Sequence, residues 1–225
     1  MKLPTYVVER TPQPIKVDGV LDEPVWGRLQ PVGAFRRHDG SGAPPFATAA
    51  KLCWDDEYLY LAFSCEDRDI WGTYTERDDP IYDQEVVEVF VSPSGNESDY
   101  FELEVSPRNV IWDGKIHNPE NNPATATYDP SWDCAGLLTG VHVVGNLDDR
   151  ADADEMWTVE MAIPFSAIAP RAPAAGEHWR ANLFRIDRGE NDEYLCWSPP
   201  QDRGQSPAFH LPKRFGRLVF SARAA

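Results

Sequence analysis

The sequence lacks the runs and residue pairs that mark several large classes of protein. None of its apolar runs approaches the roughly 20 residues that a helix needs to cross a bilayer. Its four cysteines form no C-x-x-C pair, which argues against a zinc ribbon or a redox motif. The opening MKLPTYVVERTPQP lacks the apolar core of a secretory signal. We therefore expect a cytoplasmic protein, or a secreted or periplasmic one if a signal segment has been removed.

Motifs of common catalytic and cofactor sites are missing as well. There is no G-x-S-x-G, no H-E-x-x-H or other paired spacing among the five histidines, and no glycine-rich phosphate loop. We accordingly expect no enzyme and no organic cofactor. Positive charge is scarce, because 21 Lys and Arg stand against 37 Asp and Glu and give a formal net charge of −16. Such a chain has no electrostatic reason to bind nucleic acid or an anionic membrane.

Short alternating runs separated by turn residues fill most of the chain. No helix longer than a turn or two is expected, and short helical turns are predicted near 22–29 and 165–168. The predicted strands are 6–9, 15–17, 32–37, 47–54, 58–65, 84–92, 100–106, 109–115, 138–144, 157–163, 178–187, 193–197 and 215–221. This pattern is typical of an all-β sandwich or barrel, and we predict one domain over residues 1–225.

Two neighbouring predicted strands each have one apolar face and one acidic face. Strand 84–92 places Glu88 opposite a valine face, and alternation in strand 100–106 brings Glu102 and Glu104 to one side. Paired antiparallel, the two strands would present three carboxylates together. Such carboxylates could act as the acid and the nucleophile of a glycoside hydrolase. Carboxylates on an open sheet face are more often solvated, and no neighbouring motif marks a catalytic cleft.

Aromatic residues lie near this predicted acidic face. Sugar rings stack on tryptophan or tyrosine, and their hydroxyls need carboxylate, amide or guanidinium partners. Loop aromatics beside a polar sheet face supply both kinds of contact. The candidate platforms are Tyr82, Trp71, Trp112 and Trp197. Each could instead be a core or rim residue.

An acidic loop offers oxygen ligands for a hard cation. Asp148, Asp149, Asp152 and Asp154 crowd one short stretch of the chain. Calcium binds about six to eight oxygens, so this loop is a candidate structural calcium site. The alternative is a solvated acidic loop.

Several stretches carry a resemblance through nearly the whole chain. They are IKVDGVLDEPVW, AKLCWDDEYLYLAFSCED, RDDPIYDQEVVEVFVSPSG, YFELEVSPRNVIWD, WTVEMAIPF, GEHWRANLFRID, and WSPP followed by FHLPKRFGRLVF. In their order and spacing they resemble the family 9 carbohydrate-binding modules, and specifically the stand-alone bacterial proteins related to the xylanase-attached modules. The resemblance implies an antiparallel β-sandwich, immunoglobulin- or jelly-roll-like, of about ten or more strands with long loops. It also implies non-catalytic binding of an oligosaccharide or polysaccharide chain end, in xylan or cellulose utilisation, with calcium in the loops.

The resemblance further implies roles for individual residues. In the xylanase-attached modules two aromatic side chains hold the sugar end, and these correspond to Tyr82, where those modules carry tryptophan, and to Trp197. The acid six residues after the first aromatic corresponds to Glu88. Glu102 or Glu104 stands where those modules carry an arginine that meets the sugar. Exchanging a cation for an acid there changes which ligand is preferred.

Other interpretations stay open. Arg185 matches, with Asn182, the family's N-x-x-R segment, as a ligand contact or as a structural pair. A haem-binding domain of the related sandwich superfamily would need an axial ligand such as Met156 or Met161, although both fall in a strand that reads as packing. A protein-interaction domain would use its acidic surface to bind a basic partner.

Overall fold

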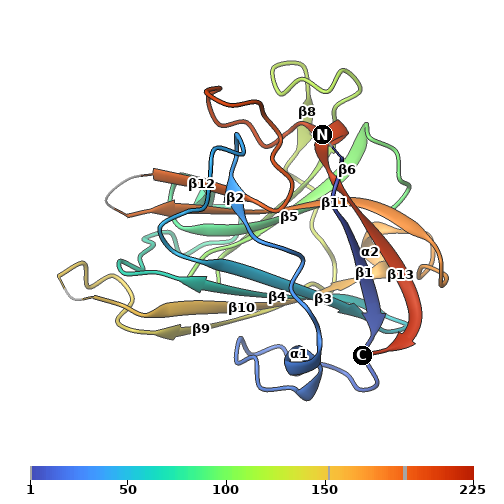
Figure 1. Ribbon diagram of the computed structural model, residues 1–225, viewed down its shortest axis with the longest axis horizontal. Coiled ribbons are helices and arrows are strands. Elements are labelled where there is room, and N and C mark those ends of the chain that lie inside the picture. The colour runs from blue at the N-terminus through green and yellow to red at the C-terminus, as the bar shows by residue number, and fades with distance from the viewer. Residues whose placement is uncertain (1, 152, 190–191) are drawn as a thin grey trace.

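The computed structural model describes residues 2–151, 153–189 and 192–225, and it consists of two packed β-layers (Figure 1). The strands are β1 Thr5–Arg10, β2 Arg36–Arg37, β3 Thr48–Trp54, β4 Tyr58–Glu66, β5 Val86–Ser92, β6 Asp99–Val105, β7 Ile111–His117, β8 Thr127–Asp129, β9 Leu138–Val144, β10 Met156–Pro164, β11 His178–Arg188, β12 Asp192–Cys196 and β13 Gly216–Ala224. The helical segments are α1 Pro24–Arg28, η1 Ile81–Asp83, α2 Phe165–Ile168 and η2 Pro212–Arg214. In this part of the chain no helix has the length and apolarity to cross a membrane.

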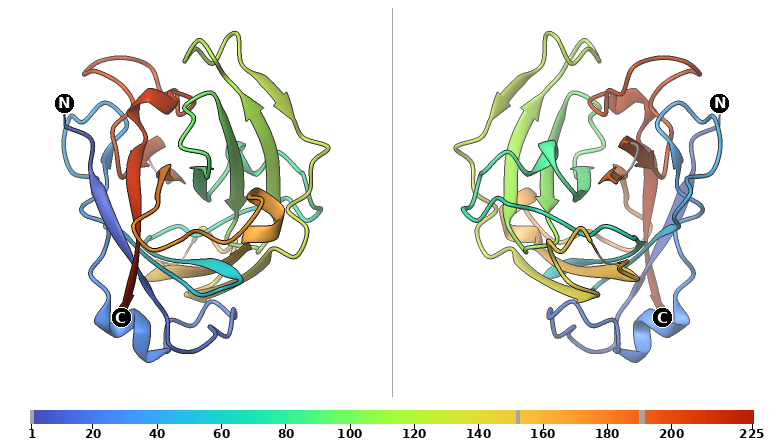
Figure 2. Two further views of the ribbon diagram at one scale, coloured as in Figure 1. Left: turned by 90° about the vertical axis from the view of Figure 1, so that its right-hand side faces the viewer. Right: turned by 90° about the vertical axis from the view of Figure 1, so that its left-hand side faces the viewer.

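The strands join into one continuous hydrogen-bonded sheet that folds over on itself. Its order is β8-β7-β6-β5-β11-β13-β1-β3-β4-β10-β9, and β12 pairs with β11 and β2 beside this path. Strands β5, β11 and β12 belong to one layer, and β3, β4, β9 and β10 belong to the other (Figure 1). Strands β1 and β13 run along one side, where the sheet passes between the layers (Figure 2). The pairings are antiparallel apart from the two made by β1, so the predicted antiparallel β-sandwich is confirmed.

The main core fills the space between the layers. Val87, Val89 and Val91 of β5 are fully buried in it, and Leu103 and Val105 of β6 are buried beside them. The predicted alternation of these two strands is therefore confirmed. Because side chains alternate along a strand, the glutamates of β5 and β6 lie on the outer side of this layer.

That outer side is not bare, because a second apolar cluster covers part of it. Phe90 of β5 and Phe184 of β11 pack there at 4.8 Å between ring centroids, and Phe209 stacks on Phe184 at 4.1 Å. The segments that carry β8 and residues 199–210 rise over this side of the layer (Figure 1). They turn an outer sheet face into a partly enclosed surface.

The strand predictions fail in three places. Residues 15–17 form no strand, and the predicted strand 32–37 shrinks to β2. Strand β8 was not expected, because 116–132 carries several prolines and polar residues. It forms as a short edge strand paired with β7, and all three of its residues are exposed. An edge strand needs only one partner, so its sequence carries little signal.

Candidate functional site

The strand register brings three glutamates together. Glu88 of β5 lies opposite Glu104 of β6, and Glu104 in turn lies opposite Trp112 of β7. Glu102 lies two positions before Glu104 and therefore on the same face. Carboxylate oxygens of the three residues lie within 4.8 Å of one another. We call Glu88, Glu102 and Glu104 the glutamate triad.

The glutamate triad forms the floor of a cavity of about 650 Å³, which we call the glutamate pocket. Aromatic rings line it on either side of the triad in strand order, with Trp112 on β7 and Tyr194 on β12. The Tyr82 ring meets Trp112 edge to face at 6.0 Å, and Tyr194 meets Phe209 in the same way at 6.2 Å. The pocket thus combines a carboxylate floor with two aromatic pairs.

Tyr82 is the most accessible of these rings. It belongs to η1, just before β5, and is 42% exposed. Arg188, at the end of β11, holds the two sides of the pocket together: it donates to the Tyr82 carbonyl at 3.4 Å and to the Tyr194 hydroxyl at 2.6 Å. Its guanidinium also pairs with Asp192 at 2.5 Å. Arg188 is thereby fixed at the rim.

The glutamate triad is deeply buried, although it faces a pocket. Glu88, Glu102 and Glu104 are 2%, 4% and 1% exposed. Burial raises the pKa of all three carboxyls, and the pKa of Glu102 rises to about 8. Their mutual repulsion adds to this rise for Glu88 and Glu104, because each carboxylate disfavours charge on its neighbour. At neutral pH the triad therefore holds protons that free glutamates would release.

His210 is the nearest basic side chain to the triad in the described part of the chain. Its Nε2 lies 3.8 Å from Glu102 Oε1, and its Nδ1 is 2.9 Å from the Tyr100 hydroxyl. Burial lowers the pKa of His210 to about 4, so the imidazole is neutral around pH 7. It therefore supplies no positive charge to the triad.

Five of the seven predicted ligand contacts line the glutamate pocket, and two lie elsewhere. Tyr82, Trp112 and the glutamate triad are at the pocket. Trp197 is instead buried in the main core at 4% exposure, where its Nε1 donates to the Val32 carbonyl at 2.7 Å. A ring so placed cannot stack on a sugar, and its assignment as the second platform is wrong. Tyr194, three residues earlier in the chain, lines the pocket, as had been predicted for Trp197.

Arg185 is likewise a structural residue. It is 0% exposed and pairs with Asp67 at 2.7 Å and with Asp187 at 3.2 Å. Asn182, its partner in the N-x-x-R segment, is also 0% exposed and exchanges hydrogen bonds with the backbone of Ser198. Both side chains hold β11 in place, and a direct ligand contact by Arg185 is excluded in this fold.

Two other candidates also have structural roles. Trp71 does not line the glutamate pocket: its Nε1 donates to the Arg188 carbonyl at 3.1 Å, and the Arg150 guanidinium lies 4.7 Å from its ring centroid. Met161, a possible haem ligand, is fully buried in the main core. Its sulfur is therefore used in packing.

The acidic loop does not assemble a shared ligand set from its described aspartates. Asp148 accepts from Gly72 N at 2.8 Å and pairs with Arg108, while Asp154 accepts from Ile70 N and Asn146 N, each at 2.7 Å. Asp149 is exposed, and Asp152 lies outside the described residues. Three groups of acids in the described part of the chain bring their oxygens close together, and none of these groups contains Asp148, Asp149 or Asp154. Calcium binding by this loop therefore stays a prediction.

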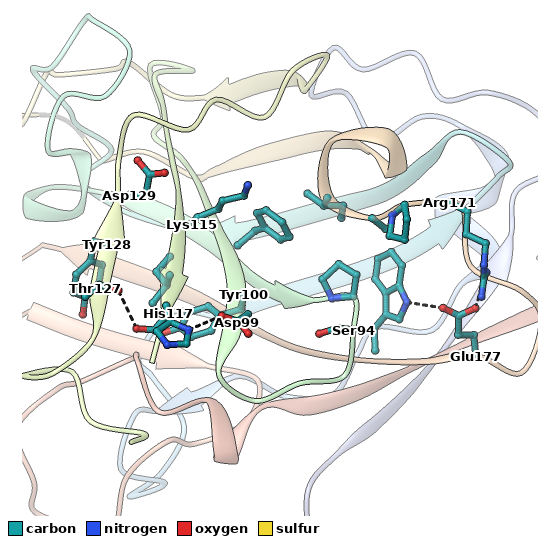
Figure 3. A pocket seen from close by; sticks show the side chains of 17 residues that line it. Ser94, Asp99, Tyr100, Lys115, His117, Thr127, Tyr128, Asp129, Arg171 and Glu177 are labelled. Atoms are coloured by element: carbon teal, nitrogen blue, oxygen red, sulfur yellow. Dashed lines mark hydrogen bonds and ion pairs between the residues drawn. The ribbon is translucent and has the colours of Figure 1, made fainter. Parts of the chain in front are cut away.

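A second cavity, of about 700 Å³, lies near β8 and α2 (Figure 3). Four of its charged side chains form pairs with each other. Asp99 accepts from His117 at 2.6 Å, and Glu177 pairs with Arg171 at 2.9 Å (Figure 3). Lys115 lies 5.7 Å from the ring centroid of Phe101. Asp129 accepts from the Ser131 hydroxyl at 2.6 Å. Unlike the glutamate pocket, this cavity has no group of carboxyls lying close together among the described residues that line it.

Several pocket residues were missed from the sequence. They are Arg188, Tyr194, Phe209, His210 and Tyr128. Tyr194 had a usable signal, because in 193–197 it alternates with Leu195 and Trp197, which are both buried in the main core. Phe209 and His210 lie in a loop, where no periodicity indicates which way a side chain points.

Two curated proteins show sequence similarity to this chain. The first, named "Extracellular protein", from Arthroderma benhamiae, is 28% identical over 181 residues, which cover 77% of this chain and 78% of that protein. The second, "Endo-1,4-beta-xylanase A" from Thermoanaerobacterium saccharolyticum, is 26% identical over 155 residues. The aligned part covers 68% of this chain but only 11% of the xylanase.

Solved structures share the fold at low sequence identity. A suspected carbohydrate-binding protein from Bacteroides uniformis superposes with a TM-score of 0.71 at 15% identity, covering 97% of this chain and 100% of that one. A family 9 carbohydrate-binding module from Caldicellulosiruptor kristjanssonii superposes with TM-scores of 0.63 in complex with cellotriose and 0.65 in complex with glucose. Each of these two comparisons is at 16% identity and covers 97% of this chain, with 94% and 96% of the module.

The family itself is settled by the sequence. Residues 17–223 match the profile of the family described as "Carbohydrate family 9 binding domain-like". This match spans most of the chain and agrees with the β-sandwich and with the solved structures of similar fold. The chain belongs to the carbohydrate family 9 binding domain-like family.

Proposed function

We propose that this protein binds the end of a saccharide chain, without catalysis, in the glutamate pocket. The observation that carries the proposal is the pocket's composition: two aromatic pairs flank a floor of carboxyl groups. Aromatic rings cover the apolar faces of a sugar ring, and carboxyl groups bind its hydroxyls. A pocket of this size accepts one or a few rings rather than an extended chain.

The raised pKa values suit the floor to hydrogen bonding with hydroxyls. A carboxylate only accepts hydrogen bonds, whereas a protonated carboxyl also donates. Because burial raises the pKa of all three glutamates, their carboxyls keep their protons at a higher pH than exposed glutamates do. The triad can therefore bond a sugar hydroxyl as donor and as acceptor.

The same geometry speaks against hydrolysis. A glycosidase places its two carboxyl groups on either side of the scissile bond. Glu88 and Glu104 project from adjacent strands on one face of one sheet, as does Glu102. All three approach a ligand from the floor, so none can act from the opposite side. We expect no reducing-sugar release from xylan or cellulose.

The similar proteins suggest a setting for this binding. The Thermoanaerobacterium relative is an endo-1,4-beta-xylanase, and the Caldicellulosiruptor module was solved with cellotriose and with glucose. We infer that plant polysaccharides of the xylan and cellulose type are the first ligands to test. Utilisation of such polysaccharides is the process in which we place the protein.

Calorimetric titration with cellotetraose and xylotetraose tests the proposal. We expect the protein to bind at least one of the two tetrasaccharides. Its affinity should fall when the terminal ring of that sugar is reduced to an open-chain alditol. Replacing Tyr82 or Tyr194 by alanine removes a stacking surface, and we expect a loss of about tenfold or more in affinity from each, as aromatic stacking contributes roughly 1–3 kcal/mol.

Tyr58→Ala is the matched control. Tyr58 is a half-buried tyrosine outside the pocket, packed on Tyr60 at 5.7 Å between ring centroids. The variant Tyr58→Ala should leave the affinity for the tetrasaccharides unchanged. A folded wild type that binds neither sugar, or binds them equally well after Tyr82→Ala and Tyr194→Ala, would refute the proposal.

A further inference from the structure

Three clusters of acidic side chains occur in the described part of the chain, and each brings its carboxylate oxygens within 4.8 Å of one another. The first consists of Asp67, Glu85 and Asp187, the second of Asp78, Asp113 and Asp133, and the third is the glutamate triad. Like charges at this spacing repel strongly when buried. How each cluster is neutralised therefore distinguishes a structural group from a binding site.

The first two clusters contain an internal cation. Arg185 lies 2.7 Å from Asp67, 3.2 Å from Asp187 and 4.0 Å from Glu85. In the second cluster, Arg77 lies 2.7 Å from Asp113, 2.9 Å from Asp133 and 3.9 Å from Asp78. In both, the fold supplies the positive charge that the acids require.

The glutamate triad has no such cation. Among the described ion pairs its single partner is His210 at 3.8 Å, which is neutral near pH 7. Arg188 lines the same pocket, but its Nη1 binds Asp192 and Tyr194, its buried Nε has no hydrogen-bond partner among the described residues, and no described ion pair joins it to the triad. The Oε2 atoms of Glu102 and Glu104 are buried and have no hydrogen-bond partner in the described structure.

Two other described glutamates, Glu23 and Glu85, also have a buried Oε2 without a hydrogen bond, but each accepts a backbone N–H at its Oε1. Glu160 accepts from Trp26 Nε1 at 2.7 Å and from two backbone N–H groups, and Asp154 accepts from two backbone N–H groups. Glu85 accepts from Arg188 N. The missing partner of the triad is therefore a specific feature of the pocket floor.

We propose that the glutamate pocket selects a saccharide carrying a primary ammonium group, such as an unacetylated glucosamine unit, whose cation completes the glutamate triad. This proposal rests on the saccharide-binding function proposed above and deepens it. An ammonium group has three N–H donors, and the floor offers three carboxyl groups close together. Charge-assisted hydrogen bonds of this kind are about twice as strong as neutral ones.

The walls favour an organic cation over a metal ion. Calcium takes about six to eight oxygen ligands. Beside the triad, however, the pocket is lined by carbon-rich side chains such as Phe90, Trp112, Ile186 and Phe209. An amino sugar uses both parts of this surface, because its ammonium meets the carboxyl groups and its ring meets the aromatic side chains.

Two sugars that differ in one group provide the test. The β-1,4-linked tetramer of glucosamine and cellotetraose share a backbone, and the first has an amine where the second has a hydroxyl. We expect calorimetry at pH 7 to show that wild-type protein binds the glucosamine tetramer about tenfold or more tightly than cellotetraose. The tetramer of N-acetylglucosamine, which lacks the cation, should show no such preference.

Glu104→Gln keeps the shape of the floor and removes one carboxylate. It should abolish the preference for the glucosamine tetramer, because the affinity for that tetramer falls more than the affinity for cellotetraose when one charge-assisted bond is lost. Glu57→Gln, which removes an exposed acid in the β3–β4 turn, should change neither value. Circular dichroism confirms that each variant is folded.

The outcomes separate this inference from the function on which it rests. Equal or weaker binding of the glucosamine tetramer, with cellotetraose still bound, overturns the ammonium proposal and leaves saccharide binding standing. A preference that survives Glu104→Gln also overturns it. Binding of CaCl₂ alone that is lost in Glu104→Gln means that the triad holds a metal, which overturns it too. If folded protein binds no sugar, both proposals fail.

Discussion

Glu104 and Glu88 face each other across β5 and β6, a position where like charges destabilise a sheet. Because burial and mutual repulsion raise the pKa of the triad, the folded protein keeps protons that the unfolded chain loses. The free energy of unfolding should then fall as pH rises from the ordinary glutamate value of 4.5 towards the pKa of about 8 of Glu102. Without ligand, the triad costs the fold stability in alkaline solution.

Removing one of these acids should stabilise the ligand-free protein at high pH. We expect Glu104→Gln to raise the unfolding midpoint at pH 9 by at least about 2 °C, because a shift of one pKa unit is worth about 1.4 kcal/mol. At about pH 3.5, below the ordinary glutamate pKa of 4.5, the carboxyl is mostly protonated in both states, and the variant and wild type should differ little. Thermal unfolding followed by circular dichroism measures both. A variant less stable than wild type at pH 9 would contradict this prediction, because it would mean that favourable contacts stabilise the ionised carboxylate of Glu104.

At the scale of elements, the pocket depends on how β11 holds the segment that follows β12. Asn182, fully buried in β11, donates to the Ser198 carbonyl at 2.8 Å and accepts from Ser198 N at 2.9 Å. The segment that begins at Ser198 continues to Phe209 and His210 at the pocket. One side-chain amide thus connects the main sheet to one side of the binding site.

Asn182→Ala should weaken both the fold and the site. It leaves the Ser198 backbone groups buried without partners, at a cost of about 2 kcal/mol. We expect the unfolding midpoint to fall by about 4–8 °C and sugar affinity to drop as Phe209 loses its support. Ser206→Ala, in the exposed part of the same segment, serves as the control and should change neither. Unaltered stability of Asn182→Ala would mean that the segment is held by other contacts.

The strands of the site were predictable and its loops were not. Apolar residues alternate regularly along β5 and β6. This alternation was enough to predict that Glu88, Glu102 and Glu104 lie on one face of the sheet. The same rule separates Tyr194 from Trp197 on β12, whereas the family resemblance had pointed to Trp197. Phe209 reaches the pocket through a long-range contact with Phe184, which no local pattern encodes.

For the molecule as a whole, β13 is the strand that closes the sheet. It pairs with β11 on one side and with β1 on the other, and it buries Leu218 and Phe220 in the main core. Without it, the sheet path between the two layers is interrupted. The predicted strand 215–221 is therefore central to the architecture, although its sequence resembles that of any other strand.

Deleting β13 should abolish cooperative folding. A chain ending at Phe215 loses both core residues and the partner of β1, and we expect it to be aggregated or to unfold without a sharp transition. A chain ending at Ser221 keeps Leu218 and Phe220 and should unfold cooperatively, with a modest decrease in midpoint. Scanning calorimetry and size-exclusion chromatography distinguish the two. A cooperative transition in the shorter chain would show that the two layers fold without their link.

The parallel pairing of β1 with β13 also bears on the rate of folding. Thr5 pairs with Arg217 and Val8 with Phe220, so the backbone pairs that close the sheet join residues very far apart in the sequence. Until β13 is in place, β1 has little more than Glu9 and Arg10 to pair with β3. Because contacts between such distant residues form slowly, we expect closure of the sandwich to limit the rate of folding.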